Sequence, residues 1–319
     1  MKKLALGLLA LLVAAAGWVW WGMPARGDVA ALARDNPART SVMRQREEEA
    51  RRGGRTLRTS QSWVPMGRIS RHLVHAVLSS EDQKFFGHEG VDWDAIKESV
   101  EVNRAQRRFA RGGSTITQQL AKNLFFTTHK SLVRKGQELL VARWLEEDLS
   151  KRRILELYLN VIEWGHGIYG CQAAALRYYG KPCSDLGVQE AAGLAAMIPN
   201  PRRIHPAANP ARHARAQRRV LWLMANAGYL SRQGLGAEPP AVEEEEEEEE
   251  DPAPEAGAWA AEEAPAAEEP APSPEPSAAV ESGAVEPTPA PEASPTPEAA
   301  PPAELPPAPA PPPDSGTTR

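Results

Sequence analysis

Two adjacent carboxylates, Glu81 and Asp82, stand in a segment whose residue types suit acid–base chemistry. A carboxylate held at the right place can take a proton from a hydroxyl group during a transfer reaction. The serine pair Ser79-Ser80 before them is also typical of a helix start, where acidic residues of the first turn are stabilised by the helix dipole. Taken alone, the segment favours this structural interpretation, and His88 is also more readily structural than catalytic.

A second segment, residues 111–123, suits binding of a phosphate. It reads Arg-Gly-Gly-Ser-Thr-Ile-Thr-Gln-Gln-Leu-Ala-Lys-Asn, so a glycine pair leads through hydroxyl groups into a predicted helix. Free backbone N–H groups at such a helix start attract phosphate. Further donors come from Ser114, Thr115, Gln118, Gln119 and Lys122. The spacing is not that of a P-loop, so nucleotide binding is not supported, and an ordinary capped helix fits equally well.

A third segment, residues 130–138, combines cations with a carboxylate. Lys130, Arg134 and Glu138 follow one another at intervals of four residues, so on a helix they share a face. One interpretation is a surface ion pair, and the other is a carboxylate held among cations beside a phosphate. Two further segments are a helix that ends in a glycine-rich turn, residues 154–170, and the helix stop Pro199-Asn200-Pro201.

The elements that must position these groups are predicted to be helices. From about residue 68 to residue 237, apolar residues recur at helical spacing, for example in 69–78, 139–145, 154–159 and 191–195. No run of alternating β-branched residues indicates a sheet. The sequence therefore predicts a mostly α domain over residues 68–237.

The N-terminal residues 1–23 are predicted to be a transmembrane signal-anchor. Residues 4–23 carry no charge, and twenty residues of helix span about 30 Å, the thickness of a bilayer core. Lys2 and Lys3 precede this run, and tryptophans, which favour the membrane interface, lie at its far end. A cleaved signal peptide is the alternative. Residues 24–67, which are polar, are predicted to be a juxtamembrane lead-in.

Charge is divided unevenly along the chain. Residues 238–319 hold 22 of the 42 acidic residues and one of the 37 basic residues, so their formal charge is −21 and that of residues 1–237 is +16. A basic body suits an anionic partner, although it can equally reflect solubility. The tail is rich in Pro, Ala and Glu and is predicted to be disordered. Cys171 and Cys183 could pair outside the cytoplasm, although their spacing does not require it.

The order of these motifs resembles the peptidoglycan glycosyltransferase family, the transglycosylases of bacterial cell-wall synthesis. Glu-Asp-x-x-Phe-x-x-His-x-Gly at 81–90, the Gly-Gly-Ser-Thr segment at 112–123 and Arg-Lys-x-x-Glu at 134–138 are followed by Tyr-Leu-Asn-Val-Ile-Glu-Trp-Gly at 158–165 and Pro-Asn-Pro at 199–201. The match covers about residues 68–230. Because the remainder is the acidic tail, the chain resembles the monofunctional form. The resemblance implies a mostly α, lysozyme-like, two-lobed glycosyltransferase domain after one transmembrane helix.

The resemblance also implies an activity: polymerisation of lipid II into β-1,4-linked glycan strands, with release of undecaprenyl diphosphate. Glu81 matches the general base and Glu138 the second catalytic carboxylate, on the donor side. The positions that match substrate-binding or supporting residues are Asp82, Ser114, Gln118, Gln119, Lys122, Lys130, Arg134 and Asn160. No cofactor is required, no metal ligand cluster is evident, and a divalent cation at the diphosphate stays open.

The implied partners are lipid II, the growing lipid-linked glycan chain, the membrane and other cell-wall synthesis proteins, with no nucleic acid. The implied location is the bacterial inner membrane, with a cytoplasmic N-terminus and a periplasmic catalytic domain. The sequence leaves two alternative functions open. A lytic glycosidase would also depend on a glutamate but would need neither the Gly-Gly-Ser-Thr loop nor the row of cations. A non-enzymatic scaffold would act through the acidic tail.

Overall fold

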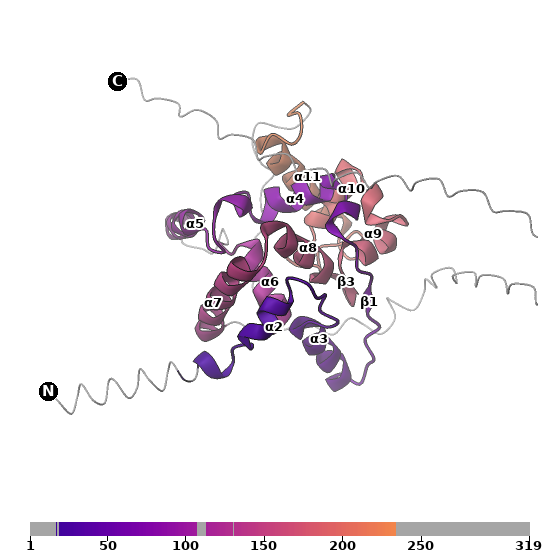
Figure 1. Cartoon of the computed structure of the whole chain (residues 1–319). Coiled ribbons are helices and arrows are strands. Elements are labelled where there is room, and N and C mark those ends of the chain that lie inside the picture. The colour runs from indigo at the N-terminus through magenta and orange to yellow at the C-terminus, as the bar shows by residue number, and fades with distance from the viewer. Residues whose placement is uncertain (1–16, 18, 107–112, 130, 234–319) are drawn as a thin grey trace, which may run out of the picture. The chain divides into compact units, whose positions relative to one another are not determined.

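The computed structural model describes residues 17, 19–106, 113–129 and 131–233, and these residues form mostly helices, as predicted (Figure 1). The α-helices are α2 (Arg26–Ala31), α3 (Ser41–Arg52), α4 (Arg71–Glu81), α5 (Trp93–Gln106), α6 (Ile116–Phe125), α7 (Leu132–Asp148), α8 (Lys151–Val161), α9 (Cys171–Tyr179), α10 (Val188–Ala195) and α11 (Pro210–Asn226). Three short 3₁₀ helices are η1 (Met66–Arg68), η2 (Phe85–Gly87) and η3 (Cys183–Asp185).

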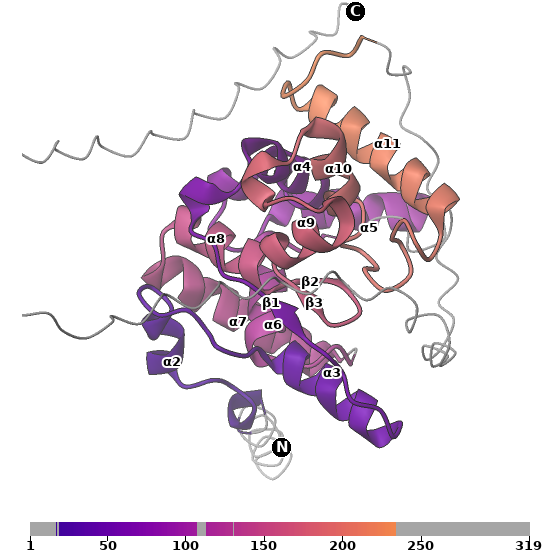
Figure 2. The ribbon, with the colours of Figure 1, turned by 90° about the vertical axis from the view of Figure 1, so that its right-hand side faces the viewer.

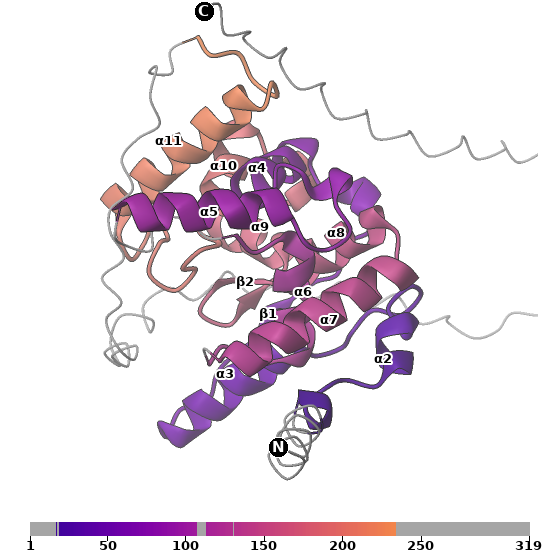
Figure 3. The same cartoon turned by 90° about the vertical axis from the view of Figure 1, so that its left-hand side faces the viewer.

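The helices of the described domain fall into two packed groups. Helix α4 packs against α10 and α11, which lie side by side in Figure 2. Helix α6 packs against both α7 and α8, and α3 packs against α6. Figure 3 shows α2 beside α7, the long helix that carries the third sequence segment. The first sequence motif begins at the end of α4 in one group, and the second and third motifs lie on α6 and α7 in the other.

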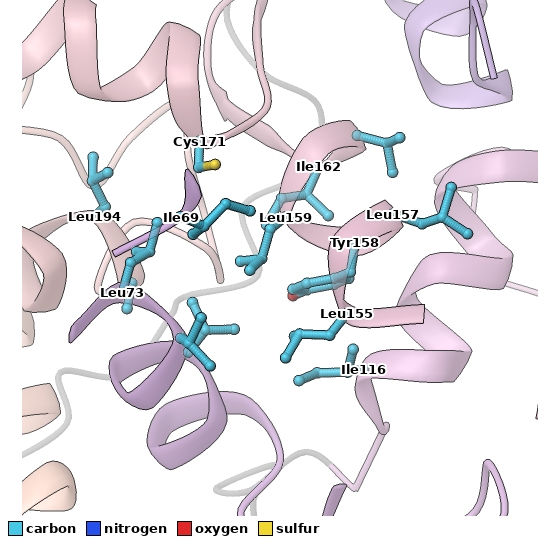
Figure 4. Packing of buried hydrophobic residues seen from close by; sticks show 14 of the residues in the cluster. Ile69, Leu73, Ile116, Leu155, Leu157, Tyr158, Leu159, Ile162, Cys171 and Leu194 are labelled. Carbon is cyan, nitrogen blue, oxygen red and sulfur yellow. The ribbon is translucent and has the colours of Figure 1, made fainter. Parts of the chain in front are cut away.

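One hydrophobic core lies beneath these helices. Its largest fully buried side chains include Trp164, Tyr158 and Phe85. Figure 4 shows Tyr158 and Leu155 of α8 near Ile116, the first residue of α6. Apolar residues on successive turns of α8 face this core, as the helical spacing predicted. Helix α8 is therefore the support on which α6 and its polar side chains rest.

A small sheet was not predicted. Its strands are β1 (Ser60–Gln61), β2 (Glu163–Gly165) and β3 (Ile168–Tyr169), in the order β1-β3-β2. Strand β1 pairs with β3 in parallel, and β2 pairs with β3 antiparallel. Strands of two or three residues are too short to show alternation in a sequence. Gly170 follows β3 with φ of +79°, and a Cβ there would lie 2.6 Å from the Asn160 carbonyl oxygen, so only glycine fits.

The predicted lead-in, residues 24–67, is packed onto the domain and contributes to its core. Val29 and Leu32 at α2, and Val64 and Met66 near η1, are buried in the main hydrophobic cluster. Strand β1 also belongs to this segment. Residue 68 therefore does not mark the start of the packed domain. The many Arg and Glu residues of the segment obscured the amphipathic pattern of α3, whose buried residues are Val42, Met43 and Ala50.

Several predictions fall on residues outside the described part of the chain. These are most of the predicted anchor at 1–23, Lys130, and the predicted disordered tail at 238–319. Within the described residues, no helix combines the length and the apolar character needed to cross a membrane.

Candidate active site

Glu81 is the last residue of α4, so the prediction of a helix start at Ser79-Ser80 is wrong. Both serines lie in the last turn, and the Ser80 hydroxyl donates to the Ala76 carbonyl oxygen at 2.9 Å. A serine hydroxyl can donate to a carbonyl oxygen of its own helix in this way, so a serine does not always mark a helix start. The negative end of the helix dipole is at Glu81, so the dipole does not stabilise its charge. The structural interpretation for Glu81 thereby loses its physical basis.

The Glu81 carboxylate is half-buried and is held by a chain of two hydrogen bonds. Gln119 of α6 donates from Nε2 to Glu81 Oε2 at 2.8 Å, and the Tyr158 hydroxyl of α8 donates to Gln119 Oε1 at 2.8 Å. Burial raises the pKa of Glu81, the charge of Asp82 adds to this, and the Gln119 hydrogen bond and the Lys122 charge oppose it. A carboxylate with a raised pKa binds a proton more strongly, as a general base must.

Asp82 and His88 form a brace between α4 and α6. The buried Asp82 carboxylate accepts a hydrogen bond from the backbone N–H of Ile116 at 3.0 Å. His88 Nε2 lies 3.0 Å and 3.1 Å from its two oxygens, and His88 Nδ1 accepts from the Gly90 N–H at 3.1 Å. Because Nδ1 accepts, the ring proton of His88 is on Nε2 and is donated to Asp82. These two residues hold Glu81 against α6.

The loop at residues 113–115 leads into α6, as predicted, but its helix start is already occupied. Asp82 accepts from the Ile116 N–H, and the Thr115 hydroxyl accepts from the Gln118 N–H at 3.2 Å. Two of the backbone groups expected to bind phosphate therefore have protein acceptors. The side chains around the loop, including the cations, can still bind an anion.

Glu138 lies buried on α7 among cations, so it does not form the surface ion pair that was one of the two interpretations of this segment. Its Oε1 is 2.9 Å from Arg134 Nε and its Oε2 is 3.6 Å from Lys135 Nζ. The Arg134 N–H is not aligned on the oxygen for a hydrogen bond, so this contact is one of charge. Arg134 is also fixed by donating from Nη1 to the Thr127 carbonyl oxygen at 2.8 Å. Glu138 is thus paired with two cations in a buried position.

Lys122 of α6 lies within electrostatic reach of both carboxylates. Burial lowers the pKa of Lys122, and so do the Arg134 and Lys135 charges, whereas Glu138 and Glu81 raise it. The lysine therefore links the base to the cation cluster, defined here as Lys122, Arg134 and Lys135. Charges that lie this close in a half-buried site interact more strongly than they would in water.

Lys135 is a site residue that sequence reasoning missed. Its Nζ donates to Ser114 Oγ at 2.7 Å and to Gln118 Oε1 at 3.0 Å, and it also contacts Glu138. Burial is the main cause that lowers the pKa of Lys135. Its spacing of three residues before Glu138 on a helix was the signal that could have found it.

Two predicted binding residues make buried contacts within the protein. Asn160 accepts from the Val64 N–H at 2.9 Å and donates to the carbonyl oxygens of Val64 and Glu156. It is fully buried, so this geometry favours the supporting position over a substrate contact. Gln118 is also buried, and its Nε2 lies 3.4 Å from the Gly90 carbonyl oxygen. Ser114 is exposed on the loop.

No group of three or more His, Cys, Asp or Glu side chains within the described ranges could hold a metal ion. The site brings together one candidate base, Glu81, one buried carboxylate, Glu138, and the three cations of the cation cluster. A hydroxyl group activated at Glu81 could attack a centre whose leaving group is an anion held by the cation cluster. Such an arrangement suits transfer to an alcohol with loss of a phosphate-type leaving group.

Comparison with known proteins points to the same chemistry. A family model described as Transglycosylase matches residues 47–225. A biosynthetic peptidoglycan transglycosylase of Azoarcus sp. (strain BH72) is 47% identical over 216 residues, which cover 67% of this chain and 94% of that protein. Proteins of the same description are 49% identical over 183 residues in Aromatoleum aromaticum, 57% and 80% of the two chains, and 50% identical over 171 residues in Bordetella pertussis, 52% and 71%. The chain therefore belongs to the transglycosylase family, the family of these biosynthetic peptidoglycan transglycosylases.

Proposed function

We propose that this enzyme polymerises lipid II into the β-1,4-linked glycan strands of peptidoglycan and releases undecaprenyl diphosphate. The observation that carries the proposal is that Glu81, held by Gln119 of α6, lies within electrostatic reach of Lys122, which also interacts with the Glu138 carboxylate that pairs with Arg134 and Lys135. A glycosyl donor that leaves as a diphosphate needs a base on the acceptor side and positive charge on the donor side. This site supplies both within one set of contacts.

On the acceptor side, Glu81 takes the proton of the lipid II 4-hydroxyl as the new bond forms. Its pKa is raised mainly by burial, so it accepts the proton more readily than an exposed glutamate does. Gln119 presents an N–H to one Glu81 oxygen, which leaves the other oxygen for the hydroxyl. The acceptor attacks from the face opposite the leaving group, so the anomeric configuration inverts.

On the donor side, the cation cluster neutralises the diphosphate as it departs. Lys135 and Arg134 are held by Glu138, whose role is to position them rather than to transfer a proton. Lys122 interacts electrostatically with Glu81 and with Glu138, so its charge favours the negative charge that develops on the diphosphate. Preorganised cations of this kind stabilise charge that develops in the transition state.

We also propose that the cation cluster makes a divalent cation dispensable. Three basic side chains surround one buried carboxylate, so the donor site keeps a net positive charge for a diphosphate. Polymerisation measured in excess EDTA tests this. Activity that is kept within about twofold supports the proposal, and loss of activity that added Mg²⁺ or Mn²⁺ restores would contradict it.

The proposed location is the inner membrane, with a cytoplasmic N-terminus and a periplasmic domain. The uncharged residues 4–23 support an anchor.

The end of that run contacts α7: Gln137 donates to the Val19 carbonyl oxygen at 2.7 Å, and the Trp20 ring packs against Trp144 edge to face, with ring centroids 6.2 Å apart. Arg26 adds ion pairs to Glu147 and Asp148. These contacts would hold the donor-side helix at the membrane, where a lipid-linked substrate is found. Protease digestion of intact spheroplasts, which removes the domain only if it is periplasmic, tests the location.

A lysozyme-like arrangement with two lobes is part of the proposal. The two helix groups, with α4, α10 and α11 in one and α6, α7 and α8 in the other, support it. Glu81 lies at the end of α4 against α6, so it stands where the two groups meet.

The experiment that tests the function offers the full-length protein lipid II in one reaction and finished peptidoglycan in another. Glycan polymer from lipid II, with no soluble fragments from peptidoglycan, is the expected result. Fragments from peptidoglycan without polymer would favour the lytic glycosidase. Neither product, from a protein that still supports growth, would favour the scaffold.

A further inference from the structure

The two cysteines of the chain lie together in the core, away from the site described above. Cys171 is the first residue of α9 and Cys183 is the first residue of η3. Their sulfur atoms are 3.5 Å apart and both side chains are fully buried. Figure 4 shows Cys171 among the apolar side chains of the core, near Ile69. The two thiols therefore lie in contact with each other, and neither contributes to the chemistry at Glu81.

The backbone around both cysteines is fixed by contacts other than the sulfur atoms. The Cys183 N–H donates to the Gln172 side-chain oxygen at 3.0 Å, so α9 holds η3 directly beside Cys171. The Cys183 carbonyl oxygen accepts from the Ser70 N–H at 3.1 Å. A disulfide needs its sulfur atoms about 2.05 Å apart. The sulfur atoms, 3.5 Å apart, must therefore move closer for the bond to form, and the backbone contacts of Cys183 keep the two residues beside each other.

We propose that Cys171 and Cys183 are joined by a disulfide in the mature protein. The two thiols give up two protons and two electrons as the S–S bond forms, and a dithiol–disulfide oxidant of the envelope takes them up as its own disulfide opens to two thiols. The buried position requires that this exchange take place while the chain folds, before the core closes. The proposal rests on the location outside the cytoplasm given above, because reducing compartments keep such thiols free.

The bridge would tie the segment that supports the catalytic helix. It closes the chain from residue 171 to residue 183, and Cys183 in turn binds the backbone at Ser70, the N-cap of α4. Ser70 is held a second time, because its hydroxyl donates to the Leu186 carbonyl oxygen at 2.7 Å. Helix α4 ends at Glu81, so the disulfide stabilises the N-terminal end of that helix, at Ser70, and does not contact the substrate.

The direct test is the thiol content of the full-length protein purified from the membrane of exporting cells. The protein is unfolded in the presence of a maleimide and its intact mass is measured. The expected result is no added maleimide and a mass lower than that of the reduced chain by two hydrogen atoms. Two maleimides on the exported protein would overturn the proposal. Refolding the same chain in a glutathione redox buffer then tells which part failed: a bridge formed there leaves the geometry correct and the location wrong.

A thermal unfolding series separates the bridge from mere packing of two thiols. For a bridge that closes a short loop, the Cys171→Ala/Cys183→Ala double variant should unfold about 5–10 °C below the unsubstituted protein. Dithiothreitol added during unfolding should lower the unfolding temperature of the unsubstituted protein by a similar amount and leave the double variant unchanged. If dithiothreitol changes neither protein, the loss in the variant comes from packing alone and the proposal is wrong. Polymerisation at low temperature should be equal in both proteins.

Discussion

The hydroxyl group of Tyr158 is predicted to control the protonation of Glu81 through one intermediate side chain. Tyr158 donates to Gln119 Oε1, which fixes the Gln119 amide so that its N–H end faces Glu81. Burial, with the charges of Glu81 and Asp82, raises the pKa of Tyr158 well above its usual range, so the hydroxyl keeps its proton and always donates. The Tyr158→Phe substitution removes this donor and leaves the ring in the core.

Without the hydroxyl, the Gln119 amide is free to turn its oxygen towards Glu81. The carboxylate then loses a donor and faces an acceptor, and both changes raise the pKa of Glu81. A hydrogen bond of this kind contributes about 0.5–1.5 kcal/mol, so the rate in the acid range should fall about two- to tenfold. The base works in its ionised form, so the acid limb of the rate profile should move to higher pH. At high pH, where Glu81 is ionised in both proteins, the rates should converge.

The assay is lipid II polymerisation at saturating substrate over a range of pH, with kcat and KM determined separately. Tyr178→Phe is the matched control, because Tyr178 also donates from its hydroxyl to one acceptor, the Trp164 carbonyl oxygen at 3.0 Å, but lies outside the site. The control should leave the position of the acid limb unchanged. A Tyr158→Phe enzyme with an unshifted limb, or with the same loss at every pH, would refute the positioning role.

Three further predictions follow from the same contacts. Glu81→Gln should raise the unfolding temperature, and by more at pH 8 than at pH 4, because the ionised form of a carboxylate with a raised pKa destabilises the fold. Scanning calorimetry at both pH values measures this, and an equal or larger gain at pH 4 contradicts it. Lys135→Met should lower kcat/KM about tenfold or more with little loss of stability, because the substitution removes a charged donor to the diphosphate. Steady-state kinetics and urea unfolding measure the two quantities, and an unchanged kcat/KM rules out a role of Lys135 in binding the diphosphate. Asp82→Ala should lower the free energy of unfolding by roughly 1.5–3 kcal/mol, because the Ile116 N–H and His88 both lose their acceptor. Urea unfolding measures this, and an unchanged free energy of unfolding would show that the contacts of Asp82 do not stabilise the fold.

Much of the helical framework could be predicted from the sequence, because helical spacing of apolar residues is a strong signal over ten or more residues. Helices α7, α8 and α10 lie where that spacing predicted them, and α10 ends before Pro199 as the helix stop indicated. Short elements leave no such signal. The three strands were missed for this reason, and so was the packing of residues 24–67, whose few apolar residues are separated by charged ones.

The sequence predicts which residue types the candidate site contains, and it predicts their contacts only in part. Glu138 lies among its cations because residues four apart on a helix share a face, which a sequence shows directly. The end of α4 at Glu81 was wrongly predicted as a helix start, because a serine pair has the same appearance in a last turn as in a cap. The Glu81–Gln119–Tyr158 chain joins three helices, and no local pattern in the sequence indicates such a contact.

The central claim is that Glu81 removes the proton of the acceptor hydroxyl, and one comparison tests it most directly. Lipid II polymerisation is measured for the unsubstituted protein, for Glu81→Gln, and for Glu146→Gln as a matched control on a half-buried glutamate paired with Lys151. The account predicts a loss in kcat of about 10²–10⁴-fold for Glu81→Gln, with lipid II binding largely kept, and near-normal activity for Glu146→Gln. A Glu81→Gln enzyme that polymerises lipid II at the unsubstituted rate would contradict the account.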